Sequence, residues 1–186
     1  MKRNSPQKPS STATPSVFRD RQVVSDRAIP CGRPFAFHDR VPITLLHPVF
    51  SQFVEDTQNI QLTPGDNTLA MDLAVAMTAF YPDEATRAES IRTVLEAHEV
   101  HFNVTKTKTT GYETDGDIST RGYRFVLAEF KNEAGSCSGE PYFQTIGYYL
   151  ESTRLQAPKM VNSPLPCLLL SIFGPFFFLN PNNVVH

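Results

Sequence analysis

Two acidic residues and a lysine lie close together in the middle of the chain, in segments that alternate as β-strands do. Glu129 and Lys131 are two residues apart at the end of the apolar stretch from Tyr123 to Lys131, so they share one face of a strand. A hairpin before this strand brings Asp115 or Asp117 beside Glu129. Carboxylates in such a group bind Mg²⁺ or Mn²⁺, which activate water and polarise a phosphoryl oxygen. These residues therefore predict a metal-dependent site for phosphodiester hydrolysis.

A glutamine and a tyrosine lie four residues apart in the segment from Pro141 to about Thr153, which has the pattern of a helix. Residues at this spacing share one helix face, so Gln144 and Tyr148 can point together toward the strand that carries Glu129. The same residues also fit an exposed polar stripe, which Glu151 continues. The sequence leaves both interpretations open.

Glu84 lies in a second predicted helix, which starts near Pro82 and Asp83 and runs to about His98. Proline and acidic residues at this point are typical of a helix start. The apolar face of this helix holds Glu84 together with Ala88, Ile91 and Leu95. Glu84 is therefore a further candidate metal ligand, although the helix dipole alone also favours an acidic residue in a first turn.

The elements that must position these residues alternate between helix and strand. The predicted strands are, in chain order, Val100 to Lys108, Tyr112 to Ile118, Tyr123 to Lys131 and Cys167 to Phe173. A turn over Ser119 to Gly122 makes the second and third strands an antiparallel hairpin. The helix between the third and fourth strands makes these two parallel, through a right-handed crossover. The order predicts an α/β fold, an αβββαβ core with a mixed central sheet.

We expect the rest of the chain to surround this core. Residues 1–16 are rich in Ser, Pro and Lys and predict a disordered tail. Residues 17–80 predict an N-terminal helical extension that ends in a buried helix over Leu69 to Phe80, and residues 81–178 predict the core itself. Residues 179–186 predict a C-terminal stub, and their polar end after an apolar run indicates a truncated product.

Composition and charge limit the classes of function. The formal net charge is −2, so no overall basic field attracts nucleic acid, and contact with nucleic acid must rest on a local patch. The cysteines Cys31, Cys137 and Cys167 are far apart and fit no zinc spacing. The N-terminus lacks the apolar stretch of a secretory signal. The apolar segment from Leu165 to Leu179 is shorter than the about 20 residues of a membrane span. We therefore expect an intracellular protein, in the cytoplasm or nucleus, that does not enter a membrane.

The order of the chemical residues resembles a known motif. Asp115 followed by the tripeptide Glu129-Phe130-Lys131 resembles the PD-(D/E)xK motif of the restriction-endonuclease-like superfamily. Gln144 and Tyr148 resemble the QxxxY element of its RecB-type branch, and Glu84 resembles the helix glutamate that completes the site in many members. The stretch from about residue 35 to 178 is also similar to a domain of basidiomycete fungal proteins that precedes a protein-kinase-like or Crinkler-type effector module.

The resemblance implies a nuclease-like fold and a role for each of these residues. It implies Mg²⁺ or Mn²⁺ as cofactor, with the ligands Asp115, Glu129 and Glu84. It implies that Lys131 is catalytic and that Gln144 and Tyr148 position the nucleic-acid backbone or the lysine. Nucleic acid is then the expected partner, with a kinase-like module in full-length relatives.

The chain also departs from the family pattern, which keeps two other hypotheses open. Thr114 stands where the motif has proline, Asp117 competes with Asp115 for the metal, and no kinase motif is present. A non-catalytic regulatory or interaction domain of a fungal kinase-like or Crinkler-type protein is therefore the alternative function. A third hypothesis is that this product folds poorly, because the run FFFL is a hazard for aggregation.

Overall fold

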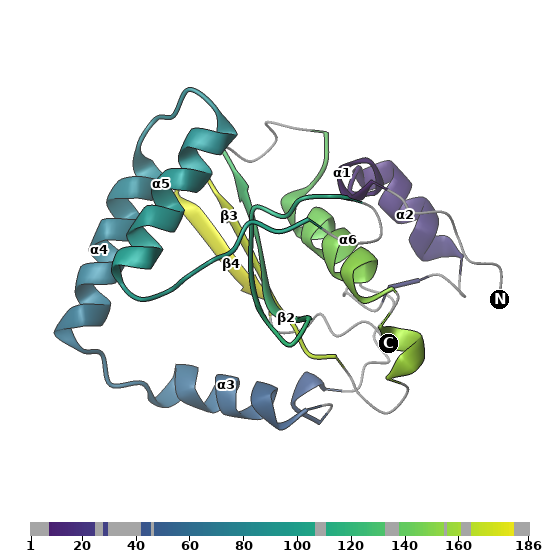
Figure 1. Cartoon of the computed structure of the whole chain (residues 1–186), viewed down its shortest axis with the longest axis horizontal. Helices are drawn as coiled ribbons and strands as arrows, with labels where there is room; N and C mark the ends of the chain where they lie inside the picture. The colour runs from purple at the N-terminus through teal and green to yellow at the C-terminus, as the bar shows by residue number, and fades with distance from the viewer. Residues whose placement is uncertain are drawn as a thin grey trace.

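The structure is a computed structural model, and its described residues are 8–24, 28–29, 42–45, 47–106, 111–132, 138–154, 156–160 and 165–180. They form a mixed α/β fold in which helices cover both faces of one four-stranded sheet (Figure 1). Helices α4 (Pro64–Thr78) and α5 (Glu84–Ala97) lie on one face. Helix α6 (Pro141–Thr153) lies on the other, with the short helices α1 (Pro9–Thr12) and α2 (Pro15–Val23) beyond it.

The sheet follows the chain order. Its strands are β1 (Gly116–Thr120), β2 (Tyr123–Lys131), β3 (Leu168–Phe173) and β4 (Phe176–Asn180), in the spatial order β1-β2-β3-β4. β1 and β2 are antiparallel, β2 and β3 are parallel, and β3 and β4 are antiparallel. The predicted antiparallel hairpin and the predicted parallel pair are both present. β1 nevertheless begins at Gly116 and ends at Thr120, later than the predicted strand over Tyr112 to Ile118. Arg121 and Gly122 form the hairpin turn with φ of 50° and 83°, as a two-residue turn between twisted strands requires.

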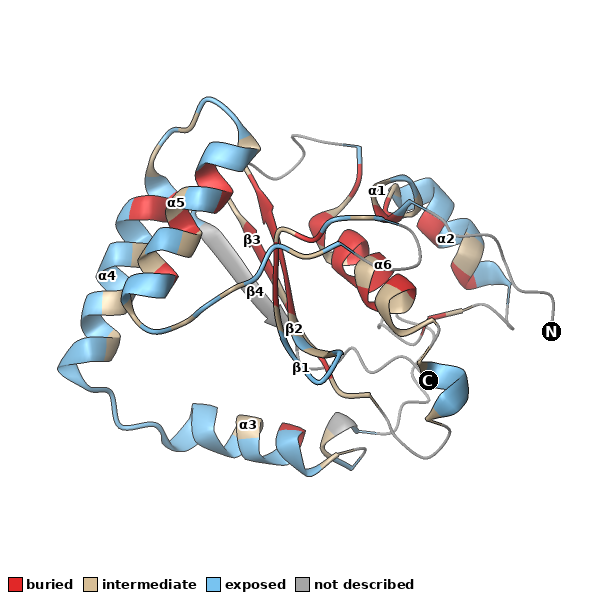
Figure 2. Cartoon of the chain, in the orientation of Figure 1, coloured by how far each residue is buried: buried red, intermediate tan, exposed pale blue. Residues whose placement is uncertain are grey.

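Helices cover both faces of β2, so the charged side chains near its end lie inside the protein. Leu127 packs in the apolar cluster on the α6 side, and Ala128 and Phe130 pack in the cluster formed with α4 and α5. Residues from Leu127 to Lys131 are therefore all buried (Figure 2). Side chains alternate between the two faces, so Glu129 and Lys131 lie on the Leu127 side, toward α6. Two charged side chains in such a position need partners.

The helix starts agree with the local sequence signals. Asp83 caps α5 by accepting the Thr86 N–H at 2.7 Å, which confirms the predicted helix start. α4 begins at Pro64, earlier than the predicted Leu69, because Thr63 and Asp66 form a reciprocal capping box. α6 has the predicted bounds. None of the described helices is long and apolar enough to span a membrane.

The first predicted strand, Val100 to Lys108, is wrong over its described part. This segment meets its neighbours through two isolated bridges, Asn103 with Asp117 and Lys106 with Glu113. The two bridges are three positions apart along one segment and four along the other, so the register slips and no continuous ladder forms. Residues 107 and 108 lie outside the described residues. The observed element order is therefore αββαββ from α5 onward, in place of the predicted αβββαβ.

The sequence predicts no strand after β3, but residues Phe176–Asn180 form one, β4. The sheet therefore has four strands, although the described part of the predicted strand before β1 does not form. Gly174, with φ of 52°, turns the chain back on β3, so Phe176–Asn180 form a second hairpin. The predicted stub over residues 179–186 therefore begins inside a strand, and residues 181–186 lie outside the described residues. The apolar run at this end of the chain belongs to the sheet.

Residues 8–16, which the composition assigned to a disordered tail, are helical and packed. Pro9 and Ala13 are buried, and the Ala13 carbonyl accepts the Glu140 N–H at 3.0 Å, just before α6. Phe18 of α2 stacks on Phe143 of α6 with ring centroids 3.7 Å apart. A few apolar contacts outweigh the polar composition here. Residues 1–7 lie outside the described residues.

The described part of residues 42–80 is mostly helical, in agreement with the predicted helical extension. η1 (Ile43–Leu45) is followed by α3 (Pro48–Asn59), and the His47 Nδ1 accepts the Val49 N–H at the start of α3. After α6, η2 (Ala157–Lys159) leads toward β3. These segments lie away from the end of β2 that carries the charged residues (Figure 1).

The predicted buried helix over Leu69 to Phe80 is wrong in its burial, because Met71, Val75 and Phe80 are 70%, 71% and 97% exposed. Only one side of α4 packs in the apolar cluster with α5, so the apolar residues of its other side face solvent.

Candidate functional site

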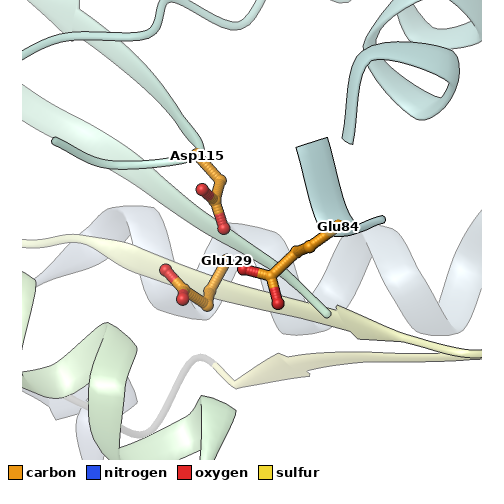
Figure 3. Close-up of side chains that lie close together, drawn as sticks. All are labelled: Glu84, Asp115 and Glu129. Carbon is orange, nitrogen blue, oxygen red and sulfur yellow. The ribbon is translucent and has the colours of Figure 1, made fainter. Parts of the chain in front are cut away.

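Three carboxylates meet beside the end of β2. Glu84, Asp115 and Glu129 each offer one oxygen, and these oxygens all lie within 4.8 Å of one another (Figure 3). Glu84 comes from the first turn of α5, Asp115 precedes β1, and Glu129 lies in β2. We call these three residues the acidic cluster. Carboxylate oxygens from three elements are a donor set that suits Mg²⁺ or Mn²⁺.

The hairpin register places Asp115 beside Glu129. Gly116 pairs with Ala128, so the residue before Gly116 faces the residue after Ala128 on the same side of the sheet. The Asp115 Oδ2 accepts the Phe130 N–H at 2.9 Å, which fixes the carboxylate against the backbone of β2. The predicted convergence of the hairpin and the following strand is thus present.

Asp117, the other aspartate of the hairpin, has different partners. Its carboxylate is fully buried and pairs with the Arg124 guanidinium at 3.1 Å and with the Thr105 hydroxyl. It is not one of the three residues that share the 4.8 Å cluster. The geometry therefore groups Asp115, and not Asp117, with Glu84 and Glu129.

Lys131 lies within the acidic cluster as its counter-charge. Its Nζ is 2.6 Å from the Glu84 Oε1 and 2.7 Å from the Glu129 Oε1. The lysine side chain is 7% exposed and Glu129 is 1% exposed, whereas Glu84 is 40% exposed. The ammonium group thus bridges a deeply buried carboxylate and one that reaches solvent.

Burial and like charge raise the pKa values of the two inner carboxyls. The pKa of Glu129 rises to about 8, first because the side chain is buried and then because Asp115 is close. Burial also raises the pKa of Asp115, against the lowering effect of the Phe130 N–H. Burial tends to lower the pKa of Lys131, but the charge of Glu129, the hydrogen bonds to Glu129 and Glu84 and the charge of Asp115 together outweigh it and raise that pKa. One ammonium group therefore does not fully neutralise the cluster.

Glu129 has an oxygen that the described residues leave without a hydrogen bond. Its Oε1 contacts the Lys131 ammonium, but its Oε2 is buried and accepts no hydrogen bond within the described part of the chain. An unpaired buried carboxylate oxygen is costly. The residues present therefore fit a divalent cation, because a metal–oxygen bond at Oε2 would remove this cost.

Gln144 and Tyr148 do not form an exposed stripe. Gln144 is buried, Tyr148 is half-buried, and Glu151, the third residue of the proposed stripe, is buried as well. Burial raises the pKa of the Tyr148 phenol, the charge of Glu129 raises it further, and a hydrogen bond with Gln144 acts in the opposite direction. Tyr148 is thus a neutral donor within electrostatic reach of the acidic cluster.

Glu84 is more than a residue that the helix dipole favours. Asp83 is the residue that caps α5, while the Glu84 carboxylate turns toward Asp115 and Glu129 (Figure 3). It also contacts the Lys131 ammonium group. Ala88, Ile91 and Leu95 are buried along the same side of α5. The apolar face of α5 therefore sets the direction in which Glu84 points.

Arg92 is a positioning residue that the sequence analysis did not identify. Its Nη1 donates to the main-chain carbonyl of Asp115 at 2.7 Å, and its Nη2 pairs with Glu89. The contact ties α5, which carries Glu84, to the segment that carries Asp115. The only sign of this role in the sequence is that Arg92 lies two turns after Glu84 on the same helix. Its acceptor is a main-chain carbonyl, and such an acceptor leaves no residue pattern in the sequence.

We expect Arg92→Met to weaken Mn²⁺ binding by about tenfold, since the loosened Asp115 must be ordered again when the cation binds. Arg92→Lys should restore part of the affinity because the ammonium group still reaches the carbonyl. Calorimetric titration with Mn²⁺ measures both values, and circular dichroism checks that the fold is kept. Unchanged affinity in Arg92→Met would show that Asp115 is held without this contact.

Comparison of the chain with known proteins assigns no family or activity to this site. No protein-family model matches the sequence, and no curated protein and no solved structure matches it either. The predicted residues Glu84, Asp115, Glu129 and Lys131 nevertheless lie together, with Tyr148 close enough for the charge of Glu129 to raise its pKa.

Proposed function

We propose that this chain is a metal-dependent phosphodiesterase of the nuclease type. The observation that carries the proposal is the convergence of three carboxylates and one lysine at the buried end of β2. The unpaired Oε2 of Glu129 supports a cation as the missing partner. Phosphodiesters are the substrate class because a lysine beside a divalent cation suits a phosphoryl group that gains negative charge.

Each side chain has a separate task in this proposal. Asp115, Glu129 and Glu84 hold Mg²⁺ or Mn²⁺, which when bound acidifies a water molecule and polarises the phosphoryl oxygen. Lys131 donates a hydrogen bond to the attacking oxygen or stabilises the negative charge that develops on the phosphoryl group. Tyr148 and Gln144 donate hydrogen bonds to the backbone of a nucleic acid or orient the lysine.

The chain order of these residues supports a restriction-endonuclease-like core of the PD-(D/E)xK type. The hairpin of β1 and β2, the helix α6 and the parallel strand β3 follow one another as that resemblance implies. The segment before β1 departs from it, since only isolated bridges form there. We therefore base the proposed membership of this family on the site residues and on the β1-β2-α6-β3 unit.

One feature favours the non-catalytic alternative. Lys131 already pairs with two carboxylates, so the cluster has a counter-charge without any cation. A regulatory domain that joins a kinase-like or Crinkler-type module could keep this arrangement for structure alone. A cleavage assay separates the two functions.

The test is cleavage of double-stranded DNA, single-stranded DNA and RNA by the purified full chain with Mg²⁺ or Mn²⁺. We expect wild type to cleave at least one of the three and Lys131→Ala to lose about 100-fold or more of that activity. Lys159→Ala is the matched control because Lys159 is an exposed lysine of η2. Equal cleavage by wild type and Lys131→Ala, or no cleavage by any of them, would reject the nuclease proposal.

A further inference from the structure

The ammonium group of Lys131 contacts two of the three carboxylates that would hold a shared cation. It lies 2.6 Å from the Glu84 Oε1 and 2.7 Å from the Glu129 Oε1. Both residues are also among the three that can share one metal ion. An ammonium group and a divalent cation held by the same two carboxylates repel each other at such distances, even where each contacts a different oxygen of Glu129.

The two carboxylates that Lys131 bridges differ in their exposure to solvent. Glu129 is 1% exposed near the end of β2, whereas Glu84 is 40% exposed at the start of α5. A side chain with this exposure can change rotamer without opening the core. The contact between Lys131 and Glu84 is therefore the part of the bridge that can open.

We propose that Lys131 is a built-in competitor of the metal, which closes the cation site until a divalent ion displaces its ammonium group. The inference deepens the proposed function and rests on it for the identity of the site. When the cation binds Glu84 and Glu129, the ammonium group leaves the carboxylates and becomes available to a phosphate group. The lysine thus has two states, one as internal counter-charge and one as donor to the substrate.

The first test compares Mn²⁺ binding by wild type and by Lys131→Met, in which the side chain keeps much of its length and loses its charge. We expect Lys131→Met to bind Mn²⁺ at least about tenfold more tightly, equivalent to about 1.4 kcal/mol. Lys159→Met is the charge control and should bind as wild type does. A lysine that only helps to hold the metal site in shape would give weaker binding in Lys131→Met.

Thermal unfolding gives a readout that is independent of cleavage. Without metal, Lys131→Met should melt below wild type, because the buried carboxylates lose their counter-charge. Saturating Mn²⁺ should then raise its melting temperature more than it raises that of wild type. A smaller increase in the variant than in wild type would overturn the inference.

A measurement on wild type covers the case in which the variant fails to fold. In ¹⁵N spectra of the lysine ammonium groups, saturating Mg²⁺ should move the signal of Lys131, the one buried lysine among the described residues. Unmoved ammonium signals at a Mg²⁺ concentration that calorimetry shows to be saturating would overturn the displacement.

These outcomes separate the inference from the proposed function. Equal or weaker metal binding by Lys131→Met overturns the competition and leaves the cleavage assay of wild type as it stands. Tighter binding by Lys131→Met with no cleavage by wild type supports the competition and rejects the nuclease. A titration in which neither protein binds Mn²⁺ overturns the competition and the metal site together.

Discussion

Glu129→Gln is expected to abolish tight divalent-cation binding and to flatten the pH dependence of stability. Burial and the charge of Asp115 raise the pKa of Glu129 to about 8, from an ordinary value of 4.5. Between these values the folded protein keeps a proton that the unfolded chain releases. Stability therefore falls as pH rises from about 4.5 toward 8. Glutamine has no proton to lose, so this contribution disappears in the variant.

The measurement is the melting temperature of the metal-free protein between pH 5 and pH 8. We expect wild type to lose several degrees over this range and Glu129→Gln to lose clearly less. Glu55→Gln, an exposed site on α3, should keep the wild-type slope. Parallel curves for wild type and Glu129→Gln would contradict the raised pKa. In wild type, Mn²⁺ affinity should increase over the same pH range, because the cation must displace the Glu129 proton.

The largest loss of stability is expected for Arg87→Met. Arg87 is buried, and its guanidinium donates to the carbonyls of Met77, Ala79 and Gly174 at 2.8, 3.2 and 3.1 Å. Its Nε also donates to the Asn132 side chain at 3.2 Å. The variant leaves buried carbonyls without donors, which costs about 1–3 kcal/mol for each group that water cannot reach. We expect a loss on the order of 3 kcal/mol.

Urea unfolding of Arg87→Met measures this loss, and the melting temperature should fall by roughly 6–12 °C. Arg19→Met is the matched control, since Arg19 is 73% exposed on α2. A loss below about 1 kcal/mol would mean that water or a rearranged side chain replaces the arginine. Because Asn132 follows Lys131 directly, we also expect weaker cation binding in the folded fraction of Arg87→Met.

The elements with a clear local signal could be predicted from the sequence. β2 and α6 have their predicted bounds, and α5 begins at the capping residue Asp83. Each combines a strong periodicity with a start or stop signal, so neighbours do not change the outcome. The pair Glu129 and Lys131 could be placed on one face for the same reason.

Elements that depend on partners could not be predicted in this way. The segment from Val100 alternates as a strand does, but a slip between its two bridges to residues 117 and 113 prevents a ladder. α1 has the composition of a tail and forms because Pro9 and Ala13 find a buried place against α6. β4 depends on pairing with β3.

The acidic cluster shows the same division between local and tertiary information. Asp115 and Asp117 lie on one face of the hairpin, and only their partners, the Phe130 N–H and the Arg124 guanidinium, separate their roles. Arg87 and Arg92 act on main-chain carbonyls. Such contacts carry no residue pattern, so the sequence analysis found neither arginine's role.

The assembly of the acidic cluster from separate elements makes cation binding a reporter of tertiary order. Lys131 and Glu84 are 47 positions apart in the chain and meet only when α5 has docked on the sheet. A compact state with native helix content but loose packing, compared with the native state at the same pH, would keep its far-ultraviolet spectrum and lose its affinity for Mn²⁺. In refolding experiments, recovery of metal affinity would therefore follow docking of the layers and lag behind the return of helix.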